Sequence, residues 1–287
     1  MRIATRDYLV PPGARVSLRE WPTAPDSAAG SGKSRRALLD EHVEQLSALQ
    51  RLQYAANRHA LLMVFQGMDT AGNDGAIRHV LSGVNPQGCE VHSFKQPSPE
   101  ELQHDFLWRT TCRLPERGRI GIFNRSYYEE VLVVRVHPEL LEAQGLDQPA
   151  PDDGAFWKGR FRSIVEFEGH LHRNGTRFVK IFLHVSKQEQ RRRLIERIDR
   201  PRKNWKFSSA DLNERALWGR YREAYEACLE ATSTPHAPWH VVPADDKEHA
   251  RLVVSQIAID TLGALREEYP RVSARQRAEL KALRKRI

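Results

Sequence analysis

The chain has 287 residues, of which 40% are hydrophobic and 29% are charged. This composition suits one large α/β domain or two small ones, and the six Trp, seven Tyr and ten Phe argue against a chain that is disordered throughout. The formal net charge of +8 favours an anionic partner or simply a soluble basic surface, and it leaves nucleic acid, nucleotide and inorganic polyanion open.

The three cysteines, Cys89, Cys112 and Cys228, lie far apart and form neither a CxxC pair nor a metal-binding spacing. We therefore expect free thiols in a reducing compartment. The sequence has no apolar run of about 18 residues and begins with no signal-peptide pattern. The expected location is the cytoplasm.

The first 34 residues are rich in Pro, Gly, Ser and Ala, and predict an extended arm (1–34) that wraps on the surface or is partly disordered. An amphipathic helix is predicted next, from Arg35 to Arg58, because its apolar residues recur at spacings of three and four. At the other end of the chain, residues 271–287 predict a basic helical tail, which we interpret as a solvated helix.

Strands and helices are expected to alternate between these two helices. The first strand segment, LLMVF, is continuously apolar, as in a strand buried on both faces. The predicted strands are 61–65, 90–94, 119–123, 177–185 and 239–243. Capping-box patterns predict helix starts at Ser98, Ser126, Ser186 and Ser208.

Glycine 175 is expected to end a helix that runs from about Phe156 to Arg173. The alternation of strands and helices predicts an α/β fold with a parallel sheet and helices on both faces. Asp245, Asp246 and Lys247 follow the last strand, where ligands gather in such sheets, although capping of the next helix by Asp246 explains this segment equally well.

Two segments resemble a phosphate-binding loop, whose pattern is G-x-x-x-x-G-K-[ST]. The segment GSGKS (30–34) contains the lysine, but Ser27 stands where glycine is required and no strand precedes it. Because such a loop works by joining a buried strand to a helix N-terminus, we interpret this match as a coincidence of small residues.

The segment GMDTAGNDG (67–75) meets the structural requirement, because a strand leads in and a helix pattern follows. Its backbone N–H groups from Asp69 to Gly75 could cradle phosphate oxygens. Asn73 stands where lysine is expected, and asparagine has two N–H donors but no charge and a shorter reach. Asp69 and Asp74 could hold Mg²⁺ directly or through water. The alternative is a plain glycine turn between strand and helix.

Longer motifs carry a more specific signal. The chain contains FNRSYYEEVLVVRVHPE from Phe123, RIDRPRKNWKFSSADLNERALWGRYREAYE from Arg197 and TSTPHAPWHVVPADDK from Thr232. With the glycine loop, they occur in the order and spacing of the polyphosphate kinase 2 family, which the chain resembles over about residues 40 to 265. The FNRS version is most similar to its single-domain subgroup.

The resemblance implies a three-layer α/β/α fold like that of P-loop kinases, with a mainly parallel five-stranded sheet. The phosphotransferase domain is expected over 35–270, with a helical lid over about 197–222. The implied reaction is in-line transfer of a phosphoryl group between inorganic polyphosphate and a purine nucleoside mono- or diphosphate, AMP or ADP first. The implied cofactor is Mg²⁺, with Mn²⁺ as a substitute.

The resemblance also implies a homodimer or homotetramer, with no membrane or nucleic-acid partner. Two alternatives remain. The chain could be an ATP-dependent nucleotide kinase of the same fold, or a catalytically impaired polyanion-binding relative, because the loop lysine is Asn73. Two further departures from the family pattern are Asn124, where many relatives have a metal-associated aspartate, and Arg200, which replaces a lid aspartate.

Roles are transferred residue by residue to the matching positions. The expected catalytic residues are Asp69, Asn73, Asn124, Arg125, Arg197 and Lys203. The expected metal ligands are Asp69 and Asp74. From the residues themselves, Trp205 is expected to stack on the nucleotide base, with aromatic packing under the lid as the alternative, and Glu129 is expected to lie near the nucleotide. The expected phosphate and polyphosphate contacts are Gly67, Ala71, Gly72, Asp74, Gly75, Arg78, Lys95, Arg117, Arg135 and Lys206.

A polyphosphate channel should be lined by cations, because every phosphate of the polymer is charged. Further candidates for this lining are Arg109, Arg113 and Arg119. Each of these arginines could equally be an ordinary solvated or salt-bridged side chain.

Overall fold

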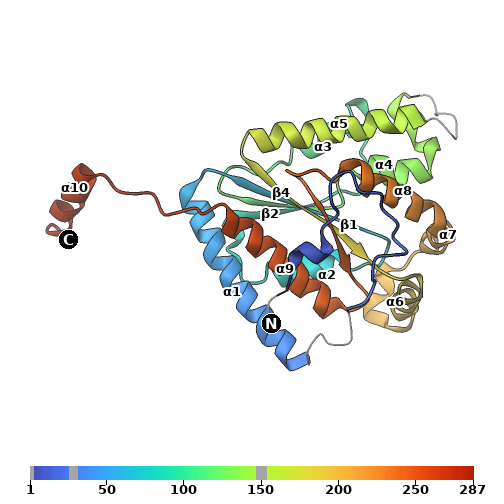
Figure 1. Ribbon diagram of the computed structural model, residues 1–287, viewed down its shortest axis with the longest axis horizontal. Helices are drawn as coiled ribbons and strands as arrows, with labels where there is room; N and C mark the ends of the chain where they lie inside the picture. The colour runs from blue at the N-terminus through green and yellow to red at the C-terminus, as the bar shows by residue number, and fades with distance from the viewer. Residues whose placement is uncertain (1–2, 26–31, 147–153) are drawn as a thin grey trace.

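The computed structural model describes residues 3–25, 32–146 and 154–287 (Figure 1). Part of the predicted arm (1–2 and 26–31), and with it the first two residues of the GSGKS match, lies outside the described residues. Residues 32–34 of that match belong to a helix, and no strand leads into them.

A five-stranded sheet forms the centre of the molecule, with strand order β2-β3-β1-β4-β5. All four neighbouring pairs are parallel. The strands are β1 (Ala60–Gly67), β2 (Cys89–Ser93), β3 (Ile120–Asn124), β4 (Thr176–His184) and β5 (Trp239–Pro243). Each predicted strand is confirmed, with ends shifted by no more than two residues. β1, β3, β4 and β5 are largely buried on both faces, whereas β2 is an edge strand with partly exposed side chains.

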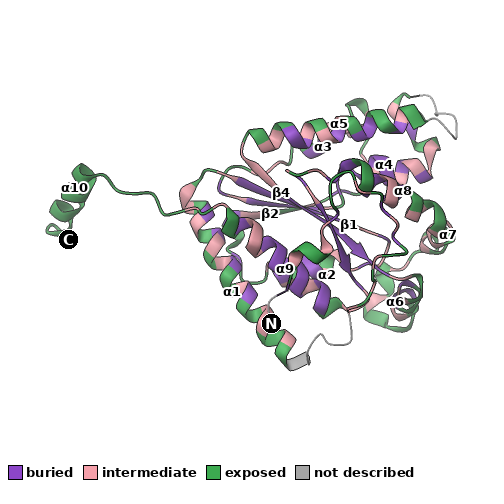
Figure 2. Cartoon of the chain, in the orientation of Figure 1, coloured by how far each residue is buried: buried purple, intermediate pink, exposed green. Residues whose placement is uncertain are grey.

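Helices cover both faces of the sheet, which confirms the three-layer α/β/α fold (Figure 1). One layer contains α1 (Gly32–Ala56), α2 (Asn73–Val80) and α9 (Lys247–Ala264). The other contains α4 (Glu129–Val136), α5 (Gly154–Arg173) and α8 (Trp218–Thr232). The buried residues gather in the strands and on the helix faces that meet them (Figure 2).

The remaining elements are short or peripheral. The lid region comprises α6 (Lys187–Asp199), the 3₁₀ helix η5 (Pro201–Lys206) and α7 (Ala210–Ala216). The others are η1 (Thr5–Tyr8), η2 (Pro86–Gly88), η3 (Glu101–Gln103), α3 (Trp108–Thr111), η4 (Pro138–Gln144) and α10 (Ala274–Arg284). Within the described ranges, no helix is both long and apolar enough to span a bilayer.

The N-terminal segment, as far as it is described, packs along the β5 edge of the sheet. Leu9 forms an antiparallel bridge with His240, and the Val10 N–H donates to the carbonyl of Trp239 at 2.9 Å. Val10 and Leu18 are buried in the same core as the sheet. This segment therefore supplies a partner for a strand edge that would otherwise be open.

The predicted helix ends are confirmed in part. α5 ends at Arg173, and Gly175 follows with φ of +100°. Ser98 and Glu101 form the reciprocal capping box. The box predicted at Ser126 is wrong, because the Glu129 side chain accepts a hydrogen bond from Gln66 instead of reaching back to the Ser126 N–H.

Candidate active site

A cavity of about 810 Å³ lies at the carboxyl edge of the sheet. Its walls are the loop after β1, the end of β3, the lid region and the start of α9. In a parallel sheet the carboxyl ends of all strands meet at one edge, and the segments after β1, β3, β4 and β5 therefore converge here. The cavity is large enough for a nucleotide-sized ligand.

The loop after β1 has the backbone of a phosphate-binding turn. Gly72 has φ of +112° and caps α2, a left-handed conformation that favours glycine. A Cβ at Gly67 would lie 2.8 Å from the Cβ of Ala71 and 3.1 Å from the Leu183 carbonyl. The two glycines therefore permit a tight turn that aims the N-terminus of α2 at the cavity, where free N–H groups favour anions.

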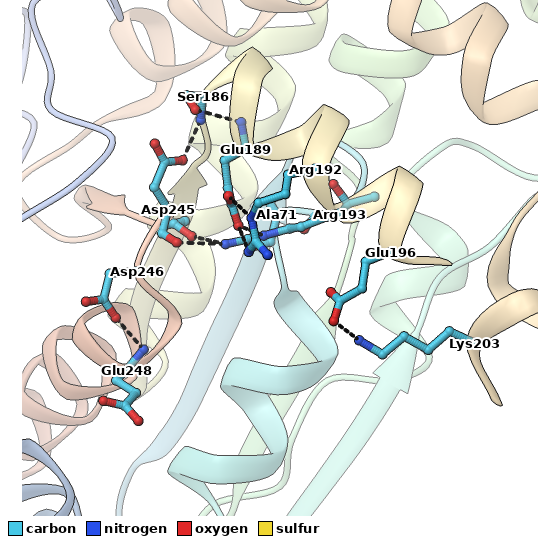
Figure 3. Close-up of polar contacts among 12 residues, drawn as sticks. Ala71, Ser186, Glu189, Arg192, Arg193, Glu196, Lys203, Asp245, Asp246 and Glu248 are labelled. Atoms are coloured by element: carbon cyan, nitrogen blue, oxygen red, sulfur yellow. Dashed lines mark hydrogen bonds and ion pairs between the residues drawn. The ribbon is translucent and has the colours of Figure 1, made fainter. Parts of the chain in front are cut away.

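Arg193 of α6 holds the backbone of this loop by hydrogen bonds (Figure 3). Its side chain is 4% exposed, and its guanidinium donates to the carbonyls of Thr70 at 3.0 Å and Ala71 at 2.8 Å. It also donates to the carbonyls of Ala244 and Asp245 after β5, and pairs with Glu189 at 2.7 Å. One side chain thus joins the loop, the lid helix and the segment after β5.

Asp69 and Asp74 line the cavity, and each faces a lid cation. The Arg197 guanidinium lies 3.4 Å from Asp69 and 3.1 Å from Asp211 of α7. The Lys206 ammonium lies 3.6 Å from Asp74, which also accepts a hydrogen bond from Asn124 at 2.7 Å. Cations of the lid region therefore lie against both acidic residues of the loop.

Asp69 and Asp74 also fit one mode of divalent-metal binding. Across the described residues, no group of three or more His, Cys, Asp or Glu side chains is placed to hold a metal ion. Mg²⁺, however, is commonly held by one or two carboxylates together with substrate phosphates and water. The two carboxylates lining one cavity satisfy that mode.

Arg125 has a left-handed backbone with φ of +62°, and its N–H donates to the Phe65 carbonyl at 3.0 Å. Its guanidinium lies 3.6 Å from Glu129, which also accepts a hydrogen bond from Gln66 at 2.7 Å. Burial raises the pKa of Glu129, and Arg125 opposes that shift. Glu129 lies behind Arg125 and does not line the cavity, so the geometry gives it a positioning role.

Most of the predicted site residues come together in this cavity. The lining includes Gly67, Asp69, Ala71, Gly72, Asn73, Asp74, Gly75, Arg78, Lys95, Asn124, Arg125, Arg197, Lys203, Trp205 and Lys206. Lys203 pairs with Glu196 at 3.0 Å, and Trp205, on η5, is 78% exposed. An exposed indole at the cavity mouth is available to stack on a base.

Two predicted polyphosphate contacts lie elsewhere. Arg117 precedes β3 at the amino edge of the sheet and donates to the Asn174 carbonyl at 3.2 Å. Arg135 of α4 packs over Trp157 and Phe161, and burial lowers its pKa. Neither side chain lines the cavity. Arg117 lies at the opposite edge of the sheet, and Arg135 points into the helix layer that contains α4 and α5.

The further channel candidates also have other positions. Arg109 is buried and donates to the Lys95 carbonyl at 2.8 Å. Arg119 pairs with Glu116 at 3.0 Å, and Arg113 is exposed. None of the three lines the cavity.

Two cations of the cavity were missed by the sequence reasoning: Arg193 and Arg251. A signal for Arg193 existed, because Gln190, Arg193 and Leu194 repeat at the spacing of one buried helix face. For the segment after β5, the predicted helix cap is confirmed, and the ligand contact stays a prediction. Asp246 caps α9, and Lys247 lines the cavity, where burial and nearby cations lower its pKa.

Comparison with known proteins agrees with this geometry. The polyphosphate kinase 2 family model matches residues 30–270. An ADP-polyphosphate phosphotransferase of Rhodopseudomonas palustris is 56% identical over 287 residues, which cover 100% of this chain and 99% of that protein. An AMP/ADP-polyphosphate phosphotransferase of Meiothermus ruber is 44% identical over 269 residues, or 92% of this chain and 95% of that protein.

Among solved structures, the crystal structure of Polyphosphate Kinase 2 from Arthrobacter aurescens TC1 superposes with a TM-score of 0.86 at 38% identity, covering 96% of this chain and 95% of that one. A putative polyphosphate kinase 2 from Pseudomonas aeruginosa superposes with a TM-score of 0.75 at 30% identity, covering 88% of this chain and 50% of that one. Sequence, fold and site agree, and the chain belongs to the polyphosphate kinase 2 family.

Proposed function

We propose that this protein transfers a phosphoryl group between inorganic polyphosphate and a nucleoside diphosphate or monophosphate, with ADP as the preferred nucleotide. The observation that carries the proposal is the charge of the cavity at the phosphate loop. Nine Lys and Arg side chains line it, against four acidic ones. The names of the two full-length relatives support ADP, since ADP occurs in both names and AMP in one.

The residues of the chain can perform the transfer without covalent catalysis. Phosphoryl transfer requires an in-line arrangement of donor and acceptor and neutralised phosphate oxygens. The N-terminus of α2 would hold the transferring phosphate, and Arg125 together with Lys206 and Arg197 of the lid would neutralise its oxygens. The remaining cations, among them Arg78, would hold the following units of polyphosphate.

Asp69 and Asp74 are the residues that would hold Mg²⁺. Bound there, the ion would neutralise phosphate charge and hold donor and acceptor in line. The two carboxylates face Arg197 and Lys206. We infer that, with substrate bound, Arg197 and Lys206 would exchange these carboxylates for phosphate oxygens and leave Asp69 and Asp74 to hold the ion.

We propose a cytoplasmic location, which the free thiols of Cys89, Cys112 and Cys228 support. A homodimer or homotetramer remains our expectation from the family resemblance.

The test is a donor and acceptor matrix. The purified protein is incubated with long-chain polyphosphate or ATP as donor, and AMP or ADP as acceptor, with Mg²⁺ or with excess chelator. We expect ATP to form from ADP and polyphosphate only when the metal is present. Phosphorylation of AMP from ATP, with none from polyphosphate, would support the ATP-dependent kinase instead. Binding of polyphosphate without turnover would support the impaired relative.

Two arginine variants provide a matched comparison. Arg125→Met should lower the rate at least about a hundredfold, because a charged contact to the reacting phosphate is lost. Arg117→Met should keep the wild-type rate, because Arg117 lies at the opposite edge of the sheet. Equal losses in both variants would contradict the assignment of this cavity.

A further inference from the structure

The net positive charge of the chain is concentrated at its C-terminal end. Residues 271–287 contribute one acidic residue, Glu279, and seven basic residues, which are Arg271, Arg275, Arg277, Lys281, Arg284, Lys285 and Arg286. Their net contribution is +6 of the formal +8, and residues 1–270 therefore carry only +2. The basicity of the sequence is mainly a property of this tail.

The tail is a well-formed helix that stands clear of the folded body (Figure 1). Ser273 and Gln276 close a reciprocal capping box at the start of α10, and the helix has no buried residue (Figure 2). Its ion pairs are local, between Arg271 and Glu268 and between Arg275 and Glu279. In the described part of the chain, the remaining five cations have no acidic partner: Arg277, Lys281, Arg284, Lys285 and Arg286.

These cations form a stripe. Arg277, Lys281, Arg284 and Lys285 follow one another at spacings of four, three and one, which place them on one side of a helix. A line of positive charges along a helix suits a flexible linear polyanion, whose charges can follow the stripe.

A second copy of the chain is a poorer partner for this helix. The body of such a copy is itself net positive, so it offers no overall charge complement. The exposed apolar residues of α10 are few, namely Leu280, Leu283 and the following Ile287. A stable interface buries about 800 Å² per partner, from roughly 20 to 30 residues, and the tail is shorter than that.

We propose that residues 271–287 are a polyphosphate tether, which binds a distal part of a long chain while the cavity holds its reacting end. The proposal rests on the proposed function. α9 connects the two sites, because Lys247 at its start lines the cavity and its other end leads to the tail. At 1.5 Å per residue, this helix of 18 residues is roughly 27 Å long. A chain of only a few phosphates cannot reach both sites, whereas a long chain can.

Occupying both sites makes the second contact intramolecular and raises the apparent affinity for long chains without a new contact at the cavity. The rate of the transfer step should not depend on the tail, because α10 lies outside the cavity. The signature of the tether is therefore a length-dependent KM with a constant kcat.

The experiment uses the full chain with five substitutions: Arg277→Gln, Lys281→Gln, Arg284→Gln, Lys285→Gln and Arg286→Gln. Glutamine keeps the helix propensity while removing the charge. The matched control removes five exposed arginines of the body that lie away from the cavity: Arg15→Gln, Arg19→Gln, Arg36→Gln, Arg51→Gln and Arg58→Gln. KM and kcat are measured for polyphosphate of a few units and of several hundred units.

We expect the tail variant to raise KM for long chains about tenfold, with kcat and the KM for short chains unchanged, and the control to behave as wild type. An unchanged KM for long chains, or an equal rise for both lengths, would overturn the tether. So would a shift in sedimentation coefficient of the tail variant, since the tail would then be an interface between copies. If wild type shows no polyphosphate-dependent turnover, the proposed function fails first. Direct binding of long-chain polyphosphate to the two variants then tests the tether separately: weaker binding by the tail variant alone supports it, and equal binding overturns it.

Discussion

Asn73 takes the loop position that ordinarily belongs to a lysine, and its side chain turns back toward the sheet. Its Nδ2 lies 3.5 Å from the Phe65 carbonyl, and its Oδ1 is buried without a hydrogen-bond partner in the described structure. The next residue, Asp74, instead faces the Lys206 ammonium of the lid. A lid lysine therefore lies where the loop itself offers no positive charge.

This arrangement predicts that Lys206, rather than Asn73, supplies the charge to the transferring phosphate. We expect Lys206→Met to lower kcat about a hundredfold, since a charge-assisted contact to the transferring phosphate would be lost. Asn73→Ala should lower it less than about threefold, because a bond at the limit of hydrogen-bond length contributes little. Steady-state kinetics with polyphosphate and ADP measure both.

The control for Lys206→Met is Lys187→Met, an exposed lysine at the start of the lid helix α6 that does not line the cavity. It should retain wild-type kcat. A larger loss for Asn73→Ala than for Lys206→Met would show that the asparagine has taken over the role of the loop lysine.

At the scale of elements, the segment after Arg125 is anchored by a buried network beneath the sheet. Tyr127 and Tyr128 each donate to Glu168 of α5 at 2.7 Å. Lys180 of β4 donates to the same carboxylate at 2.7 Å and also to the Thr232 carbonyl at 2.8 Å. Lys180 and Glu168 are both fully buried, so α4, α5, β4 and α8 meet at one ion pair.

Removing the charge of either Lys180 or Glu168 alone should lower the unfolding free energy strongly. Burial lowers the pKa of Lys180, while Glu168 opposes that shift and keeps the ammonium paired. Glu168→Gln leaves a buried ammonium without its counterion, which we expect to cost about 3 to 5 kcal/mol of unfolding free energy. The double variant Glu168→Gln, Lys180→Met should recover much of that loss, because neither charge is then buried. Urea unfolding of the three proteins measures the effect, and a double variant no more stable than Glu168→Gln would contradict it.

The elements also show what could be read from the sequence. All five strands were predicted. Four of them are apolar runs, which have one physical explanation in an α/β chain. The fifth, β2, is a partly exposed edge strand that no apolar run marks. The glycine loop was also predictable, because the strand before it and the helix after it are its neighbours in the sequence. Arg117 and Arg135 were not distinguishable from Arg78, because local sequence gives charge but not the edge or layer of the sheet.

Glu129 is a second residue whose contacts could not be predicted from the sequence. The spacing from Ser126 to Glu129 fits a capping box, and the sequence offers no sign that the carboxylate turns to Arg125 and Gln66 instead. That choice is made by β1, which is distant in sequence and brings Gln66 beside α4. Arg193 differs, because its helical period did mark a buried face.

At the scale of the whole molecule, the N-terminal segment closes the sheet at β5. The Leu9 bridge, the buried Val10 and the hydrogen bond from Ser233 to the Val10 carbonyl at 2.7 Å place this segment against β5 and the end of α8. His240 of β5 lies directly in this contact and is largely buried. The protonation of that histidine therefore affects the joint between the arm and the sheet.

Burial lowers the pKa of His240 from its ordinary value of 6.5 to about 4. Below pH 6.5 the unfolded chain binds a proton at this position that the folded chain refuses until about pH 4, so folding loses stability as the pH falls through this window. The loss approaches about 1.4 kcal/mol per pH unit and totals about 3 kcal/mol. Burial also lowers the pKa of His42, His184 and His249, which adds to the loss in the same direction.

We therefore expect the unfolding free energy, measured by urea denaturation between pH 7 and pH 4, to decrease more gently in His240→Gln than in wild type, by up to one proton's share of the slope. The comparison is made between slopes, because the substitution itself costs some stability at every pH. If the unfolding free energy of His240→Gln falls with pH as steeply as that of wild type, His240 takes up its proton in the folded protein at no cost in stability, which would contradict the prediction.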